Sequence, residues 1–213
     1  MIMMSTSTST CNLSAIIGRA TSGIDHKPSH QLVRQVALKL FSEIGFHNVS
    51  LRKLANTLEM QPGSLYNHID GKQELLFELI DEYETDLLDT IKVDLPSGSS
   101  PEHRLSAYIR SHLGFNASSP QHRSIAQLEF RNLTPNQQKI IEAIRAEYTF
   151  ILAEIIQHGI LTQVFRPIPL QVATRLILSM LTEMSREDKS NATLTIEDST
   201  TLLHETVLRI LHT

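Results

Sequence analysis

The 213-residue sequence lacks several features that define common protein classes. It has no tryptophan, and aromatic residues make up only 5% of it, which disfavours β-sandwiches and barrels because their strands favour aromatic and β-branched residues. The single cysteine, Cys11, excludes a disulfide framework and a thiolate zinc cluster, and we expect it to be a free thiol. The most apolar stretch, residues 150–161, is interrupted by polar side chains and is too short to span a bilayer.

The first residues also carry no targeting signal that we can identify. Met1 to Met4 run directly into a Ser/Thr tract, without the basic head and apolar middle of a signal peptide, so we expect a cytoplasmic protein with no membrane partner. No helical apolar period runs through residues 1–28. We therefore predict that this segment is a mobile N-terminal extension.

Signatures of enzymes are missing as well. No glycine-rich phosphate loop follows a strand, and no nucleophile elbow is present. His103, His112 and His122 are scattered over predicted helices and loops, which does not suggest a metal site. The sequence therefore predicts a protein that is not an enzyme and that has no metal and no cofactor.

Helix-forming residues dominate the sequence, and the apolar residues among them recur with a helical period. Ser29 is a predicted N-cap, and the helix that follows ends near Ile44, where Gly45 can close it in a left-handed conformation. One face of this helix is apolar and consists of Leu32, Val33, Val36, Ala37, Leu40, Phe41 and Ile44. This pattern predicts a helix packed on a core.

Two short helices are predicted next. Ser50 is the predicted N-cap of the first, whose small residue Ala55 allows a close helix crossing, and Pro62 begins the second, which is predicted to end near Ile69. A three-residue turn joins them, and Gly71 separates them from a long helix. This layout is that of a helix-turn-helix, in which the second short helix reads DNA.

The rest of the chain is predicted to be helical too, which makes the fold class all-α. The long helix after Gly71 is predicted over residues 72–91, and a loop over 94–101 separates it from further helices. The predicted breaks lie at 119–120, 134–135, Gly159 and 167–169. The longest helix is predicted at 135–158, and the last two long helices at 170–185 and 196–212.

At the helix-turn-helix the chain resembles the tetracycline-repressor (TetR) family. Four segments in order carry the resemblance: ALKLFSEIGF at 37–46, VSLRKLA at 49–55, GSLYNHI at 63–69 and GKQELL at 71–76. The resemblance implies a three-helix DNA-binding domain at 29–75 and a larger effector-binding and dimerisation domain at 76–213. It also implies a homodimer formed through the last two long helices, which binds an inverted-repeat operator in double-stranded DNA.

Roles at the DNA surface follow from position in the motif. Ser50 begins a helix, where its hydroxyl and nearby N–H groups can face a phosphate, and Tyr66 and Lys72 match the family's phosphate contacts. The remaining candidates are basic residues of the first short helix or lie on or near the recognition surface: Arg52, Lys53, Gln61, Gly63, Ser64, Asn67 and His68. Gln61 and Asn67 carry amides that can pair with adenine.

Two features leave an alternative open. Glu59 stands where the family usually has a turn glycine, and Asn67 and Ile69 replace residues that are usually aromatic. The whole chain has a net charge of −4, although residues 26–75 carry six basic and four acidic side chains. The alternative is a helical ligand-binding or scaffold protein whose degenerate helix-turn-helix no longer binds DNA.

The resemblance is weaker after Ile91. The stretch from Tyr148 to Gly159, followed by residues 164–166, looks like a recurrent segment of family members, including regulators of lipid metabolism. It implies a small apolar effector, such as an acyl-CoA. The residues expected to line its pocket are Tyr108, His112, Phe115, Phe130, Arg131, Tyr148 and Met180, with ordinary core packing as the alternative for each.

Overall fold

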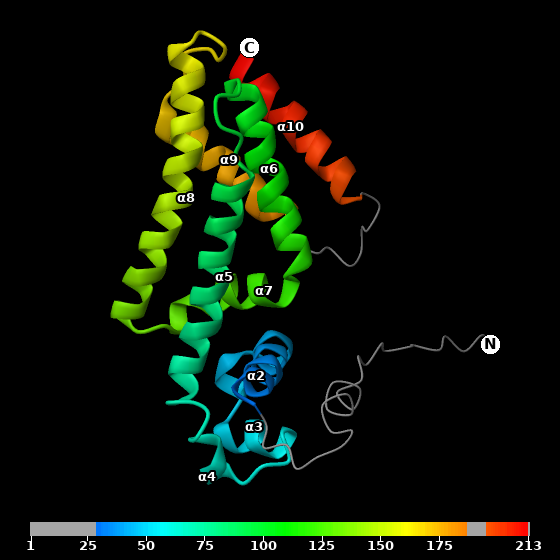
Figure 1. Cartoon of the computed structure of the whole chain (residues 1–213), viewed down its shortest axis with the longest axis vertical. Coiled ribbons are helices and arrows are strands. Elements are labelled where there is room, and N and C mark those ends of the chain that lie inside the picture. Colours follow the sequence, from blue (N-terminus) through cyan, green and yellow to red (C-terminus); the bar gives the residue numbers. More distant parts are fainter. Residues whose placement is uncertain (1–28, 187–194, 213) are drawn as a thin grey trace, which may run out of the picture.

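The computed structural model describes residues 29–186 and 195–212, and within these ranges it contains helices and no strand (Figure 1). The predicted extension at 1–28, with Cys11, lies outside the described residues. The elements are α2 (His30–Ile44), η1 (Phe46–Asn48), α3 (Leu51–Thr57), α4 (Pro62–Leu65), α5 (Lys72–Asp94), α6 (Pro101–Ser118), α7 (Pro120–Leu128), η2 (Phe130–Asn132), α8 (Pro135–Leu161), α9 (Leu170–Met184) and α10 (Ile196–His212). The all-α prediction is confirmed.

The predicted caps position the first two helices. Ser29 Oγ accepts the N–H of Leu32 at 3.2 Å, and Ser50 Oγ accepts the N–H of Lys53 at 3.0 Å, so each hydroxyl satisfies a free first-turn donor. Gly45 ends α2 with φ 82° and ψ 150°. Its φ is positive as expected, but its ψ is extended rather than left-handed helical, so the chain leaves α2 directly into η1.

The turn between α3 and α4 forms without a glycine. Glu59 adopts φ 55°, a left-handed conformation that costs a non-glycine residue about 1 kcal/mol. The turn is closed by the N–H of Met60, which donates to the carbonyl of Ala55 at 2.9 Å. Ala55 is fully buried, as expected for the small residue at the helix crossing. The substitution of the family's usual glycine has therefore not altered the motif.

Helix α4 is shorter than predicted. It ends at Leu65 rather than near Ile69, because the next N–H groups bond to carbonyls three residues back: Asn67 to Ser64 at 3.2 Å and His68 to Leu65 at 2.9 Å. These tighter bonds produce turns instead of a second α-helical turn. Leu65 and Ile69 are nevertheless both buried and fix this segment to the core.

Helix α5 runs from the N-terminal unit into the rest of the molecule (Figure 1). We call residues 29–71 the head and residues 72–186 together with 195–212 the body. One apolar core joins the head to the first half of α5 and includes Ile125 and Ala126 of α7, whereas a second core lies among the body helices. Phe115 packs against both cores, so the head and the body are joined by continuous packing.

Helix α8 is the longest element, as predicted, but Gly159 does not break it. The helix begins with a capping box in which Thr134 and Gln137 bond reciprocally, and it continues to Leu161. Gly159 is buried because the aromatic ring of Phe165 lies directly over it, where a Cβ atom would overlap the ring. The glycine therefore serves close packing rather than helix termination.

The body is completed by α9 and α10. Helix α9 packs against α8, and α10 packs mainly against α6 (Figure 1). The predicted bounds 170–185 and 196–212 agree with these helices within one residue. None of the helices in the described ranges is both long enough and apolar enough to cross a membrane.

Candidate nucleic-acid interface

The N-terminal end of α3 presents free donors and positive charge. Ser50 is exposed, and because its oxygen acts as an acceptor within the cap, its hydroxyl proton remains available for a phosphate. Arg52 and Lys53 are exposed and make no ion pair with any described residue. These side chains form a small positive surface at the start of the helix.

The other basic residues of the head are used internally. Arg34 pairs with Glu78 and Glu82 of α5, and Lys39 is buried with Glu43 3.8 Å away. The positive charge that is free to meet DNA is therefore concentrated on α3, which the net charge of the whole chain does not reveal.

Helix α4 and its flanking turns present a polar surface opposite the core. Gln61, Gly63 and Asn67 are exposed, whereas Ser64 and His68 are half-buried. Tyr66 is 60% exposed, so its ring and hydroxyl are accessible to another molecule. The structure thus places the predicted residues of this segment on one continuous stretch of the head.

Gly63 is a point at which this backbone could approach another molecule closely. It lies inside α4 with no positive φ, and a Cβ atom built there would have no heavy atom within 4 Å. Neither backbone strain nor packing within the chain explains the glycine. A residue without a side chain at this point leaves room for a partner's surface.

Lys72 is placed differently from the other candidates. Its ammonium donates to the carbonyls of Phe46 and Val49, both at 2.8 Å, and lies 4.0 Å from the centre of the Phe46 ring. Partial burial lowers the pKa of Lys72, and the carboxylate of Glu129 partly offsets this effect. In this conformation Lys72 holds the connection between α2 and α3, and a phosphate would add to or replace these bonds.

A polar network that the sequence did not predict joins the head to the body. Glu129 accepts the N–H of Phe46 at 3.1 Å, and Asn132 Oδ1 lies 2.8 Å from Nε2 of His47. Within the body, Gln73 donates to the carbonyl of Asn132 at 2.9 Å and so holds the residue that His47 contacts. These bonds connect residues up to 85 positions apart, and no local pattern in the sequence indicates them.

Three of the residues expected to line an effector pocket lie together in the core of the body. Tyr108 is fully buried and donates to the backbone carbonyl of Tyr148 at 3.0 Å, and the ring of His112 is stacked on that of Tyr108 with centroids 6.4 Å apart. Burial lowers the pKa of His112 to about 4, so the imidazole is neutral at pH 7. Its Nδ1 has no partner among the described residues.

The other four predicted pocket residues have different neighbours. Phe115 contacts Tyr83 with ring centroids 5.5 Å apart, and Phe130 lies under the guanidinium of Arg145. Arg131 is exposed in η2, and Met180 is partly buried on α9. The structure therefore brings Tyr108, His112 and Tyr148 into mutual contact, and a single pocket lined by all seven residues stays a prediction.

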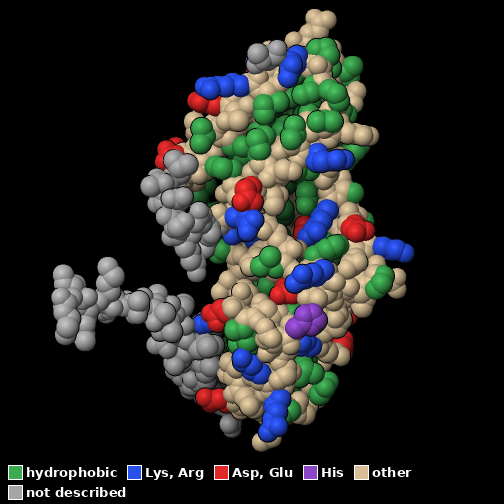
Figure 2. Space-filling view, turned by 180° about the vertical axis from the view of Figure 1, so that it is seen from behind, with side chains coloured by type: hydrophobic (Ala, Val, Ile, Leu, Met, Phe, Trp, Pro, Cys, Tyr) green, Lys and Arg blue, Asp and Glu red, His purple; other side chains and the backbone are tan. Residues whose placement is uncertain are grey.

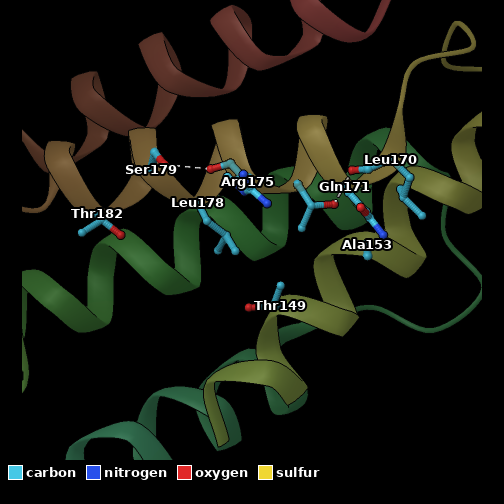
Figure 3. A pocket seen from close by; sticks show the side chains of 9 residues that line it. Thr149, Ala153, Leu170, Gln171, Arg175, Leu178, Ser179 and Thr182 are labelled. Atoms are coloured by element: carbon cyan, nitrogen blue, oxygen red, sulfur yellow. Dashed lines mark hydrogen bonds between the residues drawn. The ribbon is translucent and has the colours of Figure 1, made fainter. Parts of the chain in front are cut away.

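A hollow with a volume of about 620 Å³ lies elsewhere, between α8 and α9 (Figure 3). None of the seven predicted residues lines it. Its lining consists of Thr149, Ala153, Leu170, Gln171, Thr174, Arg175, Leu178, Ser179 and Thr182. Among the described residues, no group of three or more histidine, cysteine or acidic side chains could hold a metal ion.

Comparison with known structures places this architecture among transcriptional regulators. A tetR-family regulatory protein from Rhodococcus RHA1 superposes with a TM-score of 0.81 at 24% identity, covering 88% of this chain and 98% of that one. PfmR, a TetR-family transcriptional regulator from Thermus thermophilus, superposes with a TM-score of 0.76 at 25% identity, covering 83% and 97%.

Sequence relatives agree with the structures. The chain is 22% identical over 134 residues to the fatty acid metabolism regulator protein of Bacillus subtilis. The aligned segment spans 63% of this chain and 69% of that protein. It is 24% identical over 134 residues to the transcriptional repressor KstR2 of Rhodococcus jostii, spanning 62% and 65%.

Family models cover both parts of the molecule. Residues 33–79 match the family described as bacterial regulatory proteins, tetR family, and residues 98–210 match the tetracyclin repressor-like C-terminal domain. Together with the exposed α3–α4 surface, these matches identify a ligand-responsive, DNA-binding transcription regulator and not an enzyme. The chain belongs to the tetR family of bacterial regulatory proteins.

Proposed function

We propose that this protein is a cytoplasmic repressor that binds an inverted-repeat operator as a homodimer and is released from DNA by a small apolar effector. The observation that carries the proposal is the exposed surface of α3 and α4, where Arg52 and Lys53 have no ion-pair partner among the described residues and Tyr66 is 60% exposed. Such a surface suits phosphate contacts from α3 and base contacts from α4.

The proposed residue roles follow this geometry. Ser50, Arg52, Lys53 and Tyr66 contact phosphates, and Lys72 supports the α2–α3 connection beside them. Base edges are read from α4 and its flanks by Gln61, Gly63, Ser64, Asn67 and His68. One head offers few basic side chains, so two heads on two half-sites are needed for strong binding.

The apolar surface of α9 and α10 supports the dimer. Val172 and Leu176 of α9 are exposed by 53% and 49%, and Leu202 of α10 by 50%. Figure 2 shows hydrophobic side chains gathered on the upper half of the face that is seen from behind, where α9 lies in Figure 1. A single chain would leave this surface in water, whereas pairing with a second copy would bury it.

A substitution can test the dimer directly. Leu176→Glu places a charge in the proposed interface and should convert the dimer to a monomer in sedimentation velocity. Val93→Glu is the matched control, because Val93 is 83% exposed near the end of α5 and outside the interface. A wild-type protein that sediments as a monomer, or a Leu176→Glu dimer, would contradict this part of the proposal.

Relatives support an apolar effector. The AibR structure, with a TM-score of 0.73 at 21% identity, holds isovaleryl coenzyme A and operator DNA, and the B. subtilis relative is named for fatty acid metabolism. We propose that an acyl-CoA-like effector acts by population shift. It binds the body, displaces α5, and changes the separation of the two heads.

Selection from a library of DNA duplexes, read by fluorescence anisotropy at two salt concentrations, tests the proposed function. We expect one inverted repeat to be enriched, to bind two chains, and to lose at least about tenfold in affinity between roughly 50 and 200 mM salt as phosphate contacts are screened. Binding without any sequence selection would favour instead a helical ligand-binding protein with a degenerate helix-turn-helix.

A further inference from the structure

The hollow between α8 and α9 has the size of a small-molecule site. Its volume of about 620 Å³ lies within the range of roughly 300 to 1,000 Å³ that ligand pockets occupy. Figure 3 shows Thr149 and Ala153 of α8 facing Leu178 and Gln171 of α9 across the gap. The hollow therefore belongs to the seam between two long helices.

Most of the α9 residues that line this hollow lie beside the stripe of the proposed dimer surface, and Ser179 lies on that stripe. Residues 171, 175, 178 and 182 follow one another at helical spacings of three and four and line the hollow. Val172 and Leu176, which carry the exposed apolar surface, project about 100° further around the same helix. A second copy docked on Val172 and Leu176 would therefore border the hollow at Ser179, while Gln171, Arg175 and Leu178 face the α8–α9 seam.

Hydrogen bonds make the walls more apolar than their composition suggests. Thr149 donates its hydroxyl proton to the carbonyl of Arg145 at 2.7 Å, and Thr174 donates to that of Leu170 at 2.9 Å. Ser179 likewise donates to the carbonyl of Arg175 at 2.9 Å, the bond drawn in Figure 3. These hydroxyls have no proton left to offer, so the threonines present methyl groups beside Ala153, Leu170 and Leu178.

The remaining donors include one full positive charge. The guanidinium of Arg175 is exposed and makes no ion pair with any described residue. Across the described part of the chain, Gln171 and Thr182 also have side-chain donors without an internal acceptor. A guanidinium bonds carboxylates and phosphates through two parallel N–H groups, which gives geometric selectivity for such anions.

We propose that the α8–α9 hollow binds an alkyl or acyl chain that ends in an anionic group. The chain lies against Ala153, Leu170 and Leu178, and the carboxylate or phosphate is held by Arg175. This assignment deepens the proposed function and rests on it in one respect: the ligand is taken to be the effector. An occupant between α8 and α9 shifts α8, which packs against α5, so ligand binding would reach the heads by the displacement of α5 proposed above.

Isothermal titration of the full-length protein with three twelve-carbon probes tests the site without DNA. The probes are dodecanoic acid, dodecyl phosphate and dodecanol, each used below the concentration at which it forms micelles. We expect both anions to bind once per chain and more tightly than the neutral alcohol. A stronger response to one anion than to the other identifies whether the natural group is a carboxylate or a phosphate.

Three variants locate the binding. Arg175→Gln should weaken both anions about tenfold, the size of a lost charge-assisted hydrogen bond, and leave dodecanol unchanged. Ala153→Leu should weaken all three probes because it fills the hollow. Arg110→Gln on α6 is the matched control, since Arg110 is equally an exposed arginine but lies outside the hollow, and it should bind as the wild type does.

The inference is overturned if no anion binds, or if binding is unaffected by either Arg175→Gln or Ala153→Leu. Its failure is distinct from that of the proposed function. If the protein selects an operator but binds no amphiphile, only the proposed ligand site is refuted. If the protein binds the amphiphiles at Arg175 but selects no DNA, the ligand site is supported and the proposed regulatory role is refuted.

Discussion

Glu129, at the C-terminal end of α7, accepts the backbone N–H of Phe46, which lies in the turn between the first two helices of the head, at 3.1 Å. Lys72 donates to the carbonyl of the same residue at 2.8 Å. Phe46 is thus held through both of its peptide groups, by one side chain from α7 and one from α5. The bond from Glu129 makes the body a direct support of the turn that leads into α3.

We therefore predict that Glu129→Ala loosens this turn. The amide of Phe46 loses its acceptor, and its hydrogen exchange should accelerate by about tenfold, the effect of a net hydrogen bond worth about 1 kcal/mol or slightly more. Exchange measured by NMR or mass spectrometry on peptides covering 45–49 checks this. Glu142→Ala, an exposed glutamate on α8, is the control. Equal protection of Phe46 in the variant and the wild type would refute the contact.

A buried ion pair joins α5 to α8. Glu84 is 2% exposed, and its Oε1 accepts two bonds from Arg145, at 2.8 and 2.6 Å, while Arg145 also donates to the carbonyl of Ala126 on α7. Arg145→Met would leave the carboxylate buried without its partner. We expect a loss of about 3 to 5 kcal/mol in the free energy of unfolding, measured with urea at about pH 8.

The pH dependence of that loss gives a second, independent check. Burial raises the pKa of Glu84, and Arg145 opposes this rise, so removing Arg145 raises the pKa further. A carboxyl with a raised folded-state pKa stabilises the fold when protonated, and this stability is lost as the pH rises. Arg145→Met should therefore be less destabilising at about pH 5 than at about pH 8. Glu84→Gln in the same background should remove the difference, and its persistence would count against the assignment to Glu84.

The contribution of His112 to stability depends on pH in the opposite direction to that of Glu84. Burial lowers its pKa from 6.5 to about 4, so the unfolded chain takes up a proton in the range where the folded protein does not. Stability from this residue is present above pH 6.5 and is lost as the pH falls toward 4, with a total effect of up to about 3 kcal/mol. His112→Gln should flatten the profile over that window. Parallel unfolding curves for the variant and the wild type at roughly pH 7 and pH 4.5 would show that His112 is not buried as described.

Gly159 is constrained by packing. A Cβ atom there would overlap the ring of Phe165, which is 2% exposed and has little space to move. Gly159→Ala should destabilise the protein by about 1 to 3 kcal/mol from overpacking, even though alanine favours a helix more than glycine does. Thermal unfolding measures this. Gly159→Ala with Phe165→Leu should recover part of the loss, and an unchanged melting temperature in the single variant would be inconsistent with the contact.

Much of the fold followed from local patterns. The apolar spacing of α2 and the caps Ser29 and Ser50 predicted both helix starts, because a helix needs an apolar face and acceptors for its first N–H groups. The helices α9 and α10 were predicted within one residue for the same reason. Local chemistry dominates wherever a helix is long and amphipathic.

Features that depend on distant contacts could not be predicted. Helix α4 has a single turn and no period to measure, and the role of Gly159 depends on a ring that arrives from outside the helix. The contact of Glu129 with Phe46 joins residues 83 positions apart. The residues lining the α8–α9 hollow occupy ordinary helix positions in the sequence, because only the packing of the two helices brings them together.

The most direct test of the central claim, that the α3–α4 surface reads DNA, is the operator affinity of Gly63→Ala. A Cβ atom at this position has no neighbour within 4 Å and no positive φ to strain, so the fold should be as stable as the wild type or slightly more stable. If the backbone of α4 approaches a base pair there, the added methyl group should lower affinity for the selected inverted repeat by about tenfold or more, a steric cost of roughly 1.4 kcal/mol. Unchanged affinity in a fully folded dimer would contradict the claim.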